Sequence, residues 1–184
     1  MRKTVAYVLS SLDGVTQDPQ TFVFDYFDDE MIAQMKAIID AQDAVLLGRV
    51  TYDEWSQYWP TSTHEPFASF INDTPKYVVS STLREARWKN TTVARDVAAT
   101  IAELKAAPGR DIGVHGSIQL VRSLLQANLL DELRLATFPT IVSRGAHLGE
   151  GLEMPRPLEL ANVTRTRKGV LVSTYLAAKS KTAT

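Results

Sequence analysis

Residues 112–119, Ile-Gly-Val-His-Gly-Ser-Ile-Gln, pass from an apolar strand pattern straight into the start of a helix. The strand is expected over Ile112–His115, and behind Ser117 apolar residues recur at helical spacing, at Ile118, Val121, Leu124 and Leu125. A strand followed at once by a helix is the repeating unit of a parallel α/β sheet. In such sheets ligands bind outside the carboxyl ends of the strands, so this junction indicates both a fold class and the place of a site.

The same alternation of strands and helices extends in both directions from this junction. Apolar, β-branched runs bounded by turn residues predict strands over residues 4–11, 43–48, 76–80, 91–94 and 130–138. Helical spacing and N-cap residues predict helices over residues 28–42, behind Thr51, behind Asp96 and behind Ser117. Between Pro60 and Pro75 we expect a polar loop with at most one short turn of helix, at residues 67–71.

The rhythm changes only near the end of the chain. Residues 158–166 and 170–176 have strand patterns and are joined at Arg167-Lys168-Gly169, which is a hairpin signal. We therefore predict an α/β fold with a mostly parallel central sheet, flanked by helices, and an antiparallel C-terminal hairpin at one edge. A single domain is expected over residues 1–178, with a frayed tail over residues 179–184.

Composition narrows the class of protein. The 184 residues are 45% hydrophobic and 22% charged, which is typical of a globular chain with one core. The 20 basic and 21 acidic residues nearly cancel, so no net field favours nucleic acid or an anionic membrane as a partner. The chain shows no secretory signal and no apolar run of about 20 residues, and we expect it to be cytoplasmic.

Several familiar kinds of site are excluded by the sequence. The chain has no cysteine, which removes disulfides, thiolate zinc sites and cysteine nucleophiles. It contains no G-x-G-x-x-G fingerprint, no P-loop and no G-x-S-x-G elbow. His64-Glu65 lacks the second histidine of a zinc-protease helix, and we predict no metal site.

Small, polar or cationic residues follow four of the predicted strands, at Ser11–Gly14, Gly48–Thr51, Ser80–Thr82 and His115–Gln119. We expect these segments to line one rim. Gly116-Ser117 at a helix start would direct free N–H groups and the positive end of a helix dipole at the crevice, which suits an anion. Arg49 and Thr51 repeat this arrangement, because a guanidinium can bind phosphate through two hydrogen bonds. Two phosphate sites suggest a dinucleotide.

Each of these features also has a plainer interpretation. Gly116-Ser117 could be only a helix cap, Arg49 a surface cation in a salt bridge, and Asp13-Gly14 a tight turn. Trp55 and Trp59 fit packing better than a stacking platform. For His115, a hydrogen-bonded residue of the crevice is a better interpretation than a metal ligand.

Taken in order, these segments resemble a known family. The resemblance covers nearly the whole chain and depends on Ser10–Gly14, Gly48–Tyr52, Gly116-Ser117 with Val121–Leu125, Leu130–Leu133 and Phe138-Pro139. The chain resembles the dihydrofolate-reductase-like proteins, and within them the C-terminal reductase domain of the bifunctional riboflavin-biosynthesis deaminase-reductase and its stand-alone bacterial relatives. Family enzymes often carry paired glycines where this chain has His115-Gly116.

The resemblance implies that NADPH lies across the strand ends, beside a flat heterocyclic substrate. The implied cofactor-binding residues are Gly48, Arg49, Val50, Thr51, Ser80, Ser81, Thr82, His115, Gly116, Ser117, Ile118 and Gln119. Asp28 is the candidate proton donor, although Asp29 and Glu30 compete for that position and Asp28 could equally be an N-cap. Asp13 would contact the substrate, and Phe22 or Phe24 would cover its ring.

The leading hypothesis is an NADPH-dependent reductase of a pyrimidine, pterin or similar heterocycle, resembling 5-amino-6-(5-phosphoribosylamino)uracil reductase. One alternative is a nucleotide-binding protein of the same fold without catalysis, since a fold does not fix a function. Another is a drug-modifying reductase of relaxed specificity. The C-terminal hairpin leaves an antiparallel edge, and together with the resemblance it suggests a homodimer.

Overall fold

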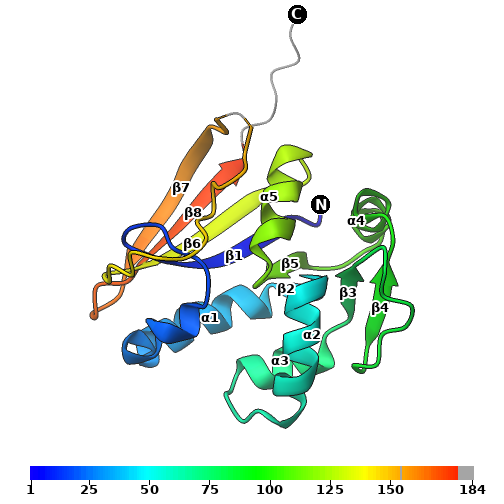
Figure 1. The fold of residues 1–184 in the computed structure, drawn as a ribbon, viewed down its shortest axis with the longest axis horizontal. Coiled ribbons are helices and arrows are strands. Elements are labelled where there is room, and N and C mark those ends of the chain that lie inside the picture. Colours follow the sequence, from blue (N-terminus) through cyan, green and yellow to red (C-terminus); the bar gives the residue numbers. More distant parts are fainter. Residues whose placement is uncertain (154, 178–184) are drawn as a thin grey trace, which may run out of the picture.

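The structure is a computed structural model that describes residues 1–153 and 155–177. Within these residues eight strands join one sheet in the order β4-β3-β2-β5-β1-β6-β8-β7 (Figure 1). The strands are β1 (Thr4–Ser11), β2 (Gln42–Gly48), β3 (Lys76–Val79), β4 (Thr91–Ala94), β5 (Asp111–His115), β6 (Glu132–Phe138), β7 (Leu158–Arg165) and β8 (Leu171–Ala177). The tail predicted to fray, residues 179–184, lies outside the described residues.

The directions of the strands confirm the predicted fold class. Strands β1 to β6 pair in parallel, whereas β8 pairs antiparallel with β6 and β7 pairs antiparallel with β8. Because parallel strands end at the same edge of a sheet, the residues that follow β1, β2, β3 and β5 share one rim. The register places Gly48 opposite Val79 and Tyr7 opposite His115.

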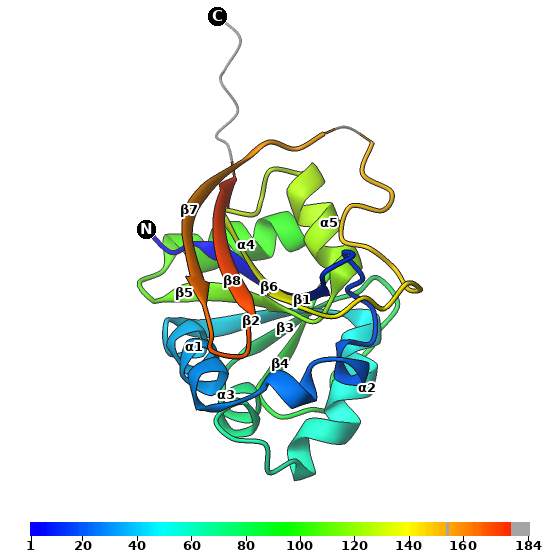
Figure 2. The same cartoon turned by 90° about the vertical axis from the view of Figure 1, so that its left-hand side faces the viewer.

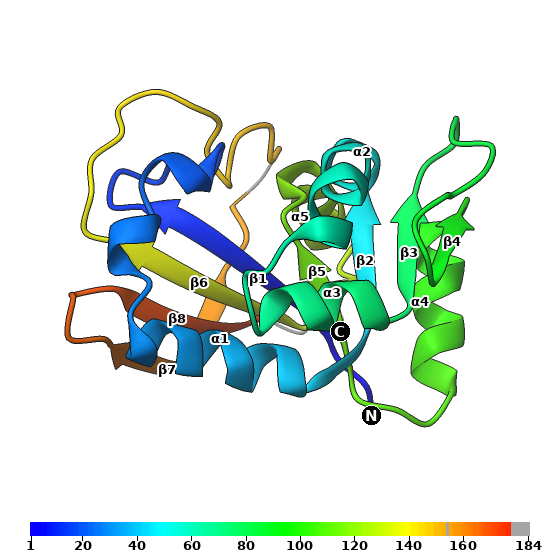
Figure 3. The same ribbon diagram turned by 90° about the horizontal axis from the view of Figure 1, so that it is seen from below.

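Helices cover both faces of this sheet. They are α1 (Asp29–Asp40), α2 (Arg49–Tyr58), α3 (Phe67–Asp73), α4 (Val97–Ala106) and α5 (Ile118–Gln126), with short 3₁₀ turns η1 (Pro19–Thr21), η2 (Phe24–Tyr26) and η3 (Trp59–Thr61). Helices α1 and α3 lie on one face and α4 and α5 on the other (Figures 1 and 3). In the described part of the chain no helix is long and apolar enough to span a membrane.

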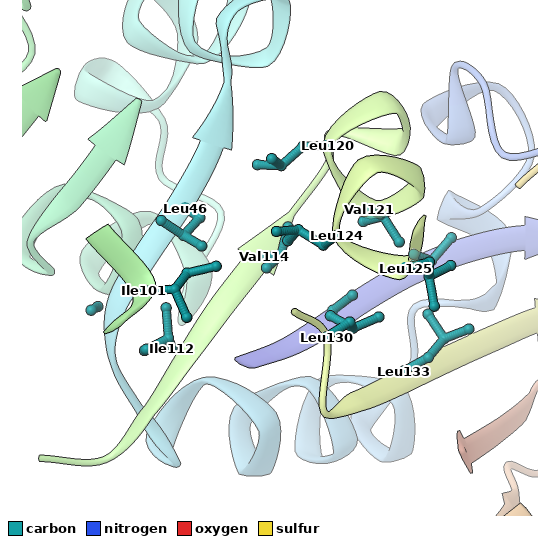
Figure 4. Packing of buried hydrophobic residues seen from close by; sticks show 13 residues of the cluster. Leu46, Ile101, Ile112, Val114, Leu120, Val121, Leu124, Leu125, Leu130 and Leu133 are labelled. Carbon is teal, nitrogen blue, oxygen red and sulfur yellow. The ribbon is translucent and has the colours of Figure 1, made fainter. Parts of the chain in front are cut away.

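Three groups of buried apolar side chains hold these layers together. The largest lies between the sheet and α4 and α5, where Leu46, Val114 and Leu124 are fully buried (Figure 4). On the opposite face, one group surrounds Phe138 under α1 and another surrounds Ile71 of α3. The hairpin β7–β8 forms one edge of the sheet and lies on the near side of the molecule in Figure 2. This packing on both faces holds the strands together, and with them the strand ends that form the rim.

Two sequence-based boundaries are wrong. Thr51 is not an N-cap, because α2 begins at Arg49 directly after the strand and Gly48 occupies the cap position. The helix predicted over residues 28–42 ends at Asp40, and Gln42 already belongs to β2. The N-cap role weighed for Asp28 is confirmed, since its carboxylate accepts the Met31 N–H at 3.0 Å.

The segment between Pro60 and Pro75 is more ordered than predicted. The short helical turn expected at residues 67–71 is present and continues to Asp73, as α3 (Phe67–Asp73). Phe67, Ala68 and Ile71 are buried, and this tertiary burial stabilises a helix that is longer than the local sequence indicates.

Candidate functional site

The ends of β2 and β5 meet at the centre of the rim. A Cβ atom on Gly48 would lie 2.0 Å from Oγ of Ser117, so the Ser117 hydroxyl occupies the space where another residue would carry its side chain. Gly116 has a φ of +69°, and a Cβ there would lie 2.8 Å from Cζ2 of Trp55 and 3.0 Å from Cγ2 of Thr51. The two turns that the sequence predicts to bind phosphate are therefore in direct contact.

Two helices start at this meeting point. Helix α2 begins at Arg49, immediately after β2, and α5 begins at Ile118, three residues after β5 ends. Gly48 has no side chain to cap α2, and the Ser117 hydroxyl makes no capping hydrogen bond to α5. Ser117 is therefore not a side-chain cap, and the first N–H groups of both helices remain available to an anion.

Arg49 stands at the first position of α2. Its Nε donates to both carboxylate oxygens of Asp53, at 2.8 and 2.7 Å, in a pair one helical turn apart. The side chain is 39% exposed, and its two Nη nitrogens make no hydrogen bond to the described residues. The salt bridge considered from the sequence is thus present, between Arg49 and Asp53. It involves only Nε, which leaves the Nη edge of the guanidinium for another partner. Val50, the next residue, is exposed.

A serine turn continues the rim beyond β3. Oγ of Ser80 accepts hydrogen bonds from the N–H groups of Thr82 and Leu83, at 3.2 and 3.0 Å. Ser81 and Thr82 are exposed. Because Gly48 lies opposite Val79 in the sheet, this turn lies next to the start of α2.

His115 closes β5 and is buried. Its Nε2 lies 2.7 Å from Oε1 of Gln42, so the predicted hydrogen bond is present, but the imidazole is buried against Phe67 and Phe70 and does not line the crevice. Burial lowers the pKa of His115 to about 4, so the imidazole is neutral at physiological pH. Of the following predicted residues, Ile118 is half-buried and Gln119 is exposed.

The predicted substrate residues lie on the β1 and α1 side of the rim. The Asp13 carboxylate accepts hydrogen bonds from the Ser11 hydroxyl and from the N–H groups of Val142 and Ser143, which together lower its pKa to about 2. It thereby joins the loop after β1 to the loop after β6. Asp28 caps α1 and is half-buried.

The two phenylalanines predicted as alternatives have different surroundings. The Phe22 ring is buried, with its centroid 6.0 Å from that of Phe138. Phe24 is 64% exposed. Only Phe24 presents a free aromatic face. Trp55 and Trp59 pack edge to face against each other and against Phe67, as the packing interpretation expects.

A cleft of about 590 Å³ lies elsewhere, between η3, α3 and Arg87–Lys89. None of the predicted site residues lines it. Its lining combines the Glu65 and Asp73 carboxylates with the Arg87 and Lys89 cations, so it has no dominant charge. The glycines and the starts of α2 and α5 meet at the strand ends, away from this cleft.

Sequence reasoning missed the contact between Gln42 and His115. A Cβ on Gly113 would lie 2.0 Å from Oε1 of Gln42, so the Gln42 side chain passes over the bare backbone of Gly113. A glycine inside a strand pattern is a recognised signal of such a close approach. Nothing in the local sequence marks Gln42 as the partner of His115, because residue 42 continues the helical pattern predicted over residues 28–42.

The fold and the rim together define a class of protein. A mostly parallel sheet in this order, with two helix starts meeting at adjacent strand ends, is the architecture of the dihydrofolate-reductase-like proteins. The chain belongs to the RibD C-terminal domain family, whose model matches residues 2–172. This is the reductase-domain family of riboflavin biosynthesis, which makes the chain a member of an oxidoreductase family.

Known proteins agree with this placement. The chain is 27% identical over 137 residues to the uncharacterized protein YyaP of Bacillus subtilis, covering 72% of this chain and 73% of YyaP. It superposes with a TM-score of 0.68 on the diaminohydroxyphosphoribosylaminopyrimidine deaminase/5-amino-6-(5-phosphoribosylamino)uracil reductase of Thermotoga maritima, at 14% identity, over 96% of this chain and 56% of that one. Dihydrofolate reductase of Schistosoma mansoni gives a TM-score of 0.62 at 15% identity, over 96% and 98% of the two chains.

The buried, neutral His115 makes stability depend on pH. An unfolded chain binds a proton on this side chain below pH 6.5, whereas the folded protein does so only near pH 4, so folding stability should fall as pH drops through this window. The full loss corresponds to about 3 kcal/mol. We expect His115→Phe to lose less free energy of unfolding between pH 7 and pH 4.5 than the wild type, in urea titrations at each pH. Equal losses in the two proteins would contradict the burial of a neutral imidazole.

Proposed function

We propose that the protein is a cytoplasmic, NADPH-dependent reductase of a pyrimidine, pterin or similar heterocycle. The observation that carries this proposal is the contact between the two uncapped helix starts at Gly48 and at Gly116-Ser117. Two anion sites in contact suit the linked phosphates of a dinucleotide better than they suit a single anion. Membership of a reductase-domain family supports the same conclusion.

The residues of the rim fit NADPH by their chemistry. N–H groups at the starts of α2 and α5 would hold the pyrophosphate, and the free Nη edge of Arg49 would hold a further phosphate, with hydroxyl groups from Ser80–Thr82 beside it. His115 and Thr51 support the backbone of this cradle from inside, and Val50 and Gln119 border it on the outside. When bound, NADPH supplies the hydride, and the protein supplies orientation.

The substrate would lie on the β1 side of the rim. The backbone N–H of Leu12 donates to the Thr140 carbonyl at 2.8 Å, which brings together two exposed apolar side chains, Leu12 at 62% and Ile141 at 69% exposure. These side chains and the free face of Phe24 would enclose a flat ring. Asp28 would deliver a proton to the reduced nitrogen, and Asp13 would keep the loops around the ring in place. We propose a substrate like 5-amino-6-(5-phosphoribosylamino)uracil, which is named for the Thermotoga enzyme.

Replacing Arg49 tests the cofactor site. We expect Arg49→Ala to weaken NADPH binding by about tenfold or more, because a charge-assisted contact with phosphate contributes about 1.5–3 kcal/mol. Binding of NADH should change less if Arg49 contacts the extra phosphate. Fluorescence titration measures both affinities. The control is Arg110→Ala, because Arg110 is an exposed arginine just before β5, at the end of the strand away from the rim. Equal affinities of wild type and Arg49→Ala for NADPH would refute the assignment.

Asp28→Asn tests the proton donor. Asparagine caps a helix about as well as aspartate, so stability and NADPH binding should persist while turnover falls by about a hundredfold or more. Asp96→Asn is a matched control, because Asp96 caps α4 through the Ala99 N–H with the same geometry. Full turnover by Asp28→Asn would remove Asp28 from the mechanism. If the wild type binds NADPH but oxidises it with no heterocycle, the alternative of a non-catalytic binding protein is correct.

We further propose that the protein is a homodimer joined through β7. This strand is at the edge of the sheet, so one row of its backbone N–H and C=O groups is unpaired within the sheet. Leu160 and Val163 lie opposite Tyr175 and Ser173 of β8, and a bulge between them keeps both side chains on one face. They are 54% and 51% exposed, and Leu171 on β8 adds a third exposed apolar side chain to the same face.

A charge placed on this face should separate the protomers. We expect the wild type to have the mass of two chains in light scattering and Val163→Asp to have the mass of one. Burying the aspartate carboxylate in an apolar interface costs free energy and so weakens the dimer. Asn162→Asp puts the same charge on the opposite face of β7 and is the matched control. A wild type that is monomeric at every concentration would refute the dimer.

A further inference from the structure

The end of β5 turns sharply at Gly116. The His115 carbonyl accepts a hydrogen bond from the Ser117 N–H at 2.8 Å, and the φ of Gly116 between them is +69°. A hydrogen bond from the N–H of one residue to the carbonyl two residues earlier, with a positive φ at the residue between them, defines the non-inverse form of the γ-turn, which is rare and strained. Strain of this kind persists only where the surrounding structure holds both sides of the turn.

Helix α2 holds the outer side of this turn. Trp55 and Thr51 approach Gly116 so closely that no Cβ would fit, and the Ser117 hydroxyl lies over the backbone of Gly48. These contacts fix the residues after the turn. They do not fix His115, whose side chain lies on the face of the sheet that α1 and α3 cover.

A buried hydrogen bond on the face of the sheet under α1 and α3 holds the other side of the turn, at His115. Gln42 begins β2, and its side chain crosses β5 over Gly113 to meet His115, with Oε1 2.7 Å from Nε2. Gln42 and His115 are 1% and 2% exposed. Because an amide oxygen only accepts hydrogen bonds, the imidazole in this arrangement carries its proton on Nε2.

The rest of the imidazole's surroundings are aromatic. Ring centroids of Phe67, Phe70 and Tyr7 lie 5.5, 5.8 and 6.4 Å from that of His115. Among the described residues Gln42 is therefore the hydrogen-bonding partner of the ring. Two apolar side chains of the same size would pack here without the cost of burying polar groups. Stability alone does not account for this pair.

We propose that Gln42 and His115 are a positioning pair, which holds the strained turn at Gly116 so that the first N–H groups of α5 point at the cofactor phosphates. The hydrogen bond fixes the imidazole, the imidazole fixes the last residue of β5, and the carbonyl of that residue receives the Ser117 N–H. Neither side chain touches cofactor or substrate. The inference rests on the proposed NADPH site and adds residues that lie beneath it.

Three variants separate positioning from stability. Gln42→Leu leaves a buried imidazole without a partner. His115→Phe leaves the Gln42 amide oxygen without one, beside an amide nitrogen that already has no partner among the described residues. The double variant replaces both side chains with apolar groups. Removing one partner leaves a buried polar group without a hydrogen bond and lowers the free energy of unfolding. Removing both partners changes that free energy little. Tyr7→Phe is the control, because it deletes a neighbouring buried hydroxyl that has no partner among the described residues.

Two readouts decide between the roles: NADPH affinity, and the hydrogen-exchange rate of the Ser117 amide in the free protein. We expect the double variant to regain the stability lost in each single variant, to bind NADPH about tenfold more weakly than the wild type, and to exchange the Ser117 amide about tenfold faster. Tyr7→Phe should match the wild type in both.

The pair has no positioning role if the double variant binds NADPH and exchanges Ser117 as the wild type does, or if affinity simply follows stability across the variants. Failure of the proposed function is visible separately, as absence of NADPH binding by the wild type. In that case the exchange rate of Ser117 still decides whether Gln42 and His115 hold the turn, because it is measured without cofactor.

Discussion

The close approach of two backbone turns governs the structure at the rim. Gly48 and Gly116 each stand where a single additional carbon atom would overlap a neighbour, and this proximity exists because β2 and β5 are adjacent parallel strands. Two helices consequently begin within contact distance of each other, with no side chain capping either one. Their partial positive charges add at one point, and an anion there is stabilised by both. This single constraint accounts for the two glycines and for the serine whose hydroxyl fills the space beside Gly48.

The burial that produces the constraint lies on both sides of the sheet. Leu124 and Leu120 of α5 pack on one face, and α1 and α3 cover the other, so the strand ends cannot separate without exposing apolar surface. Near the rim, the side chains of Gln42 and His115 meet over Gly113 inside this core and form a buried hydrogen bond. The site therefore combines a rigid cradle on the β2 and β5 side with a more exposed region around Leu12, Phe24 and Ile141 on the β1 side. Such a division suits a fixed cofactor and a substrate that comes and goes.

Local patterns were sufficient to predict the order of strands and helices, the antiparallel hairpin and the convergence of the strand ends. The junction at His115–Gln119 could be read because strand, glycine and helix follow one another without interruption. The start of α2 was misplaced since Thr51 is a better N-cap by propensity, whereas the chain enters the helix directly at the end of the strand. The full length of α3 and the Gln42–His115 contact depend on which strands and helices are neighbours, and one local segment does not contain that information. The choice between Phe22 and Phe24 depends on packing against Phe138 for the same reason.

The most direct test of this account is to titrate ¹⁵N-labelled protein with NADPH and follow its backbone amide signals by NMR. The proposed site requires the largest shifts at the starts of α2 and α5, that is at Gly48–Thr51 and Gly116–Gln119, with smaller ones at Ser80–Thr82. Signals from the cleft near Arg87–Lys89 should stay unchanged. Shifts centred on that cleft, or none at saturating NADPH, would contradict the assignment of the rim as the cofactor site.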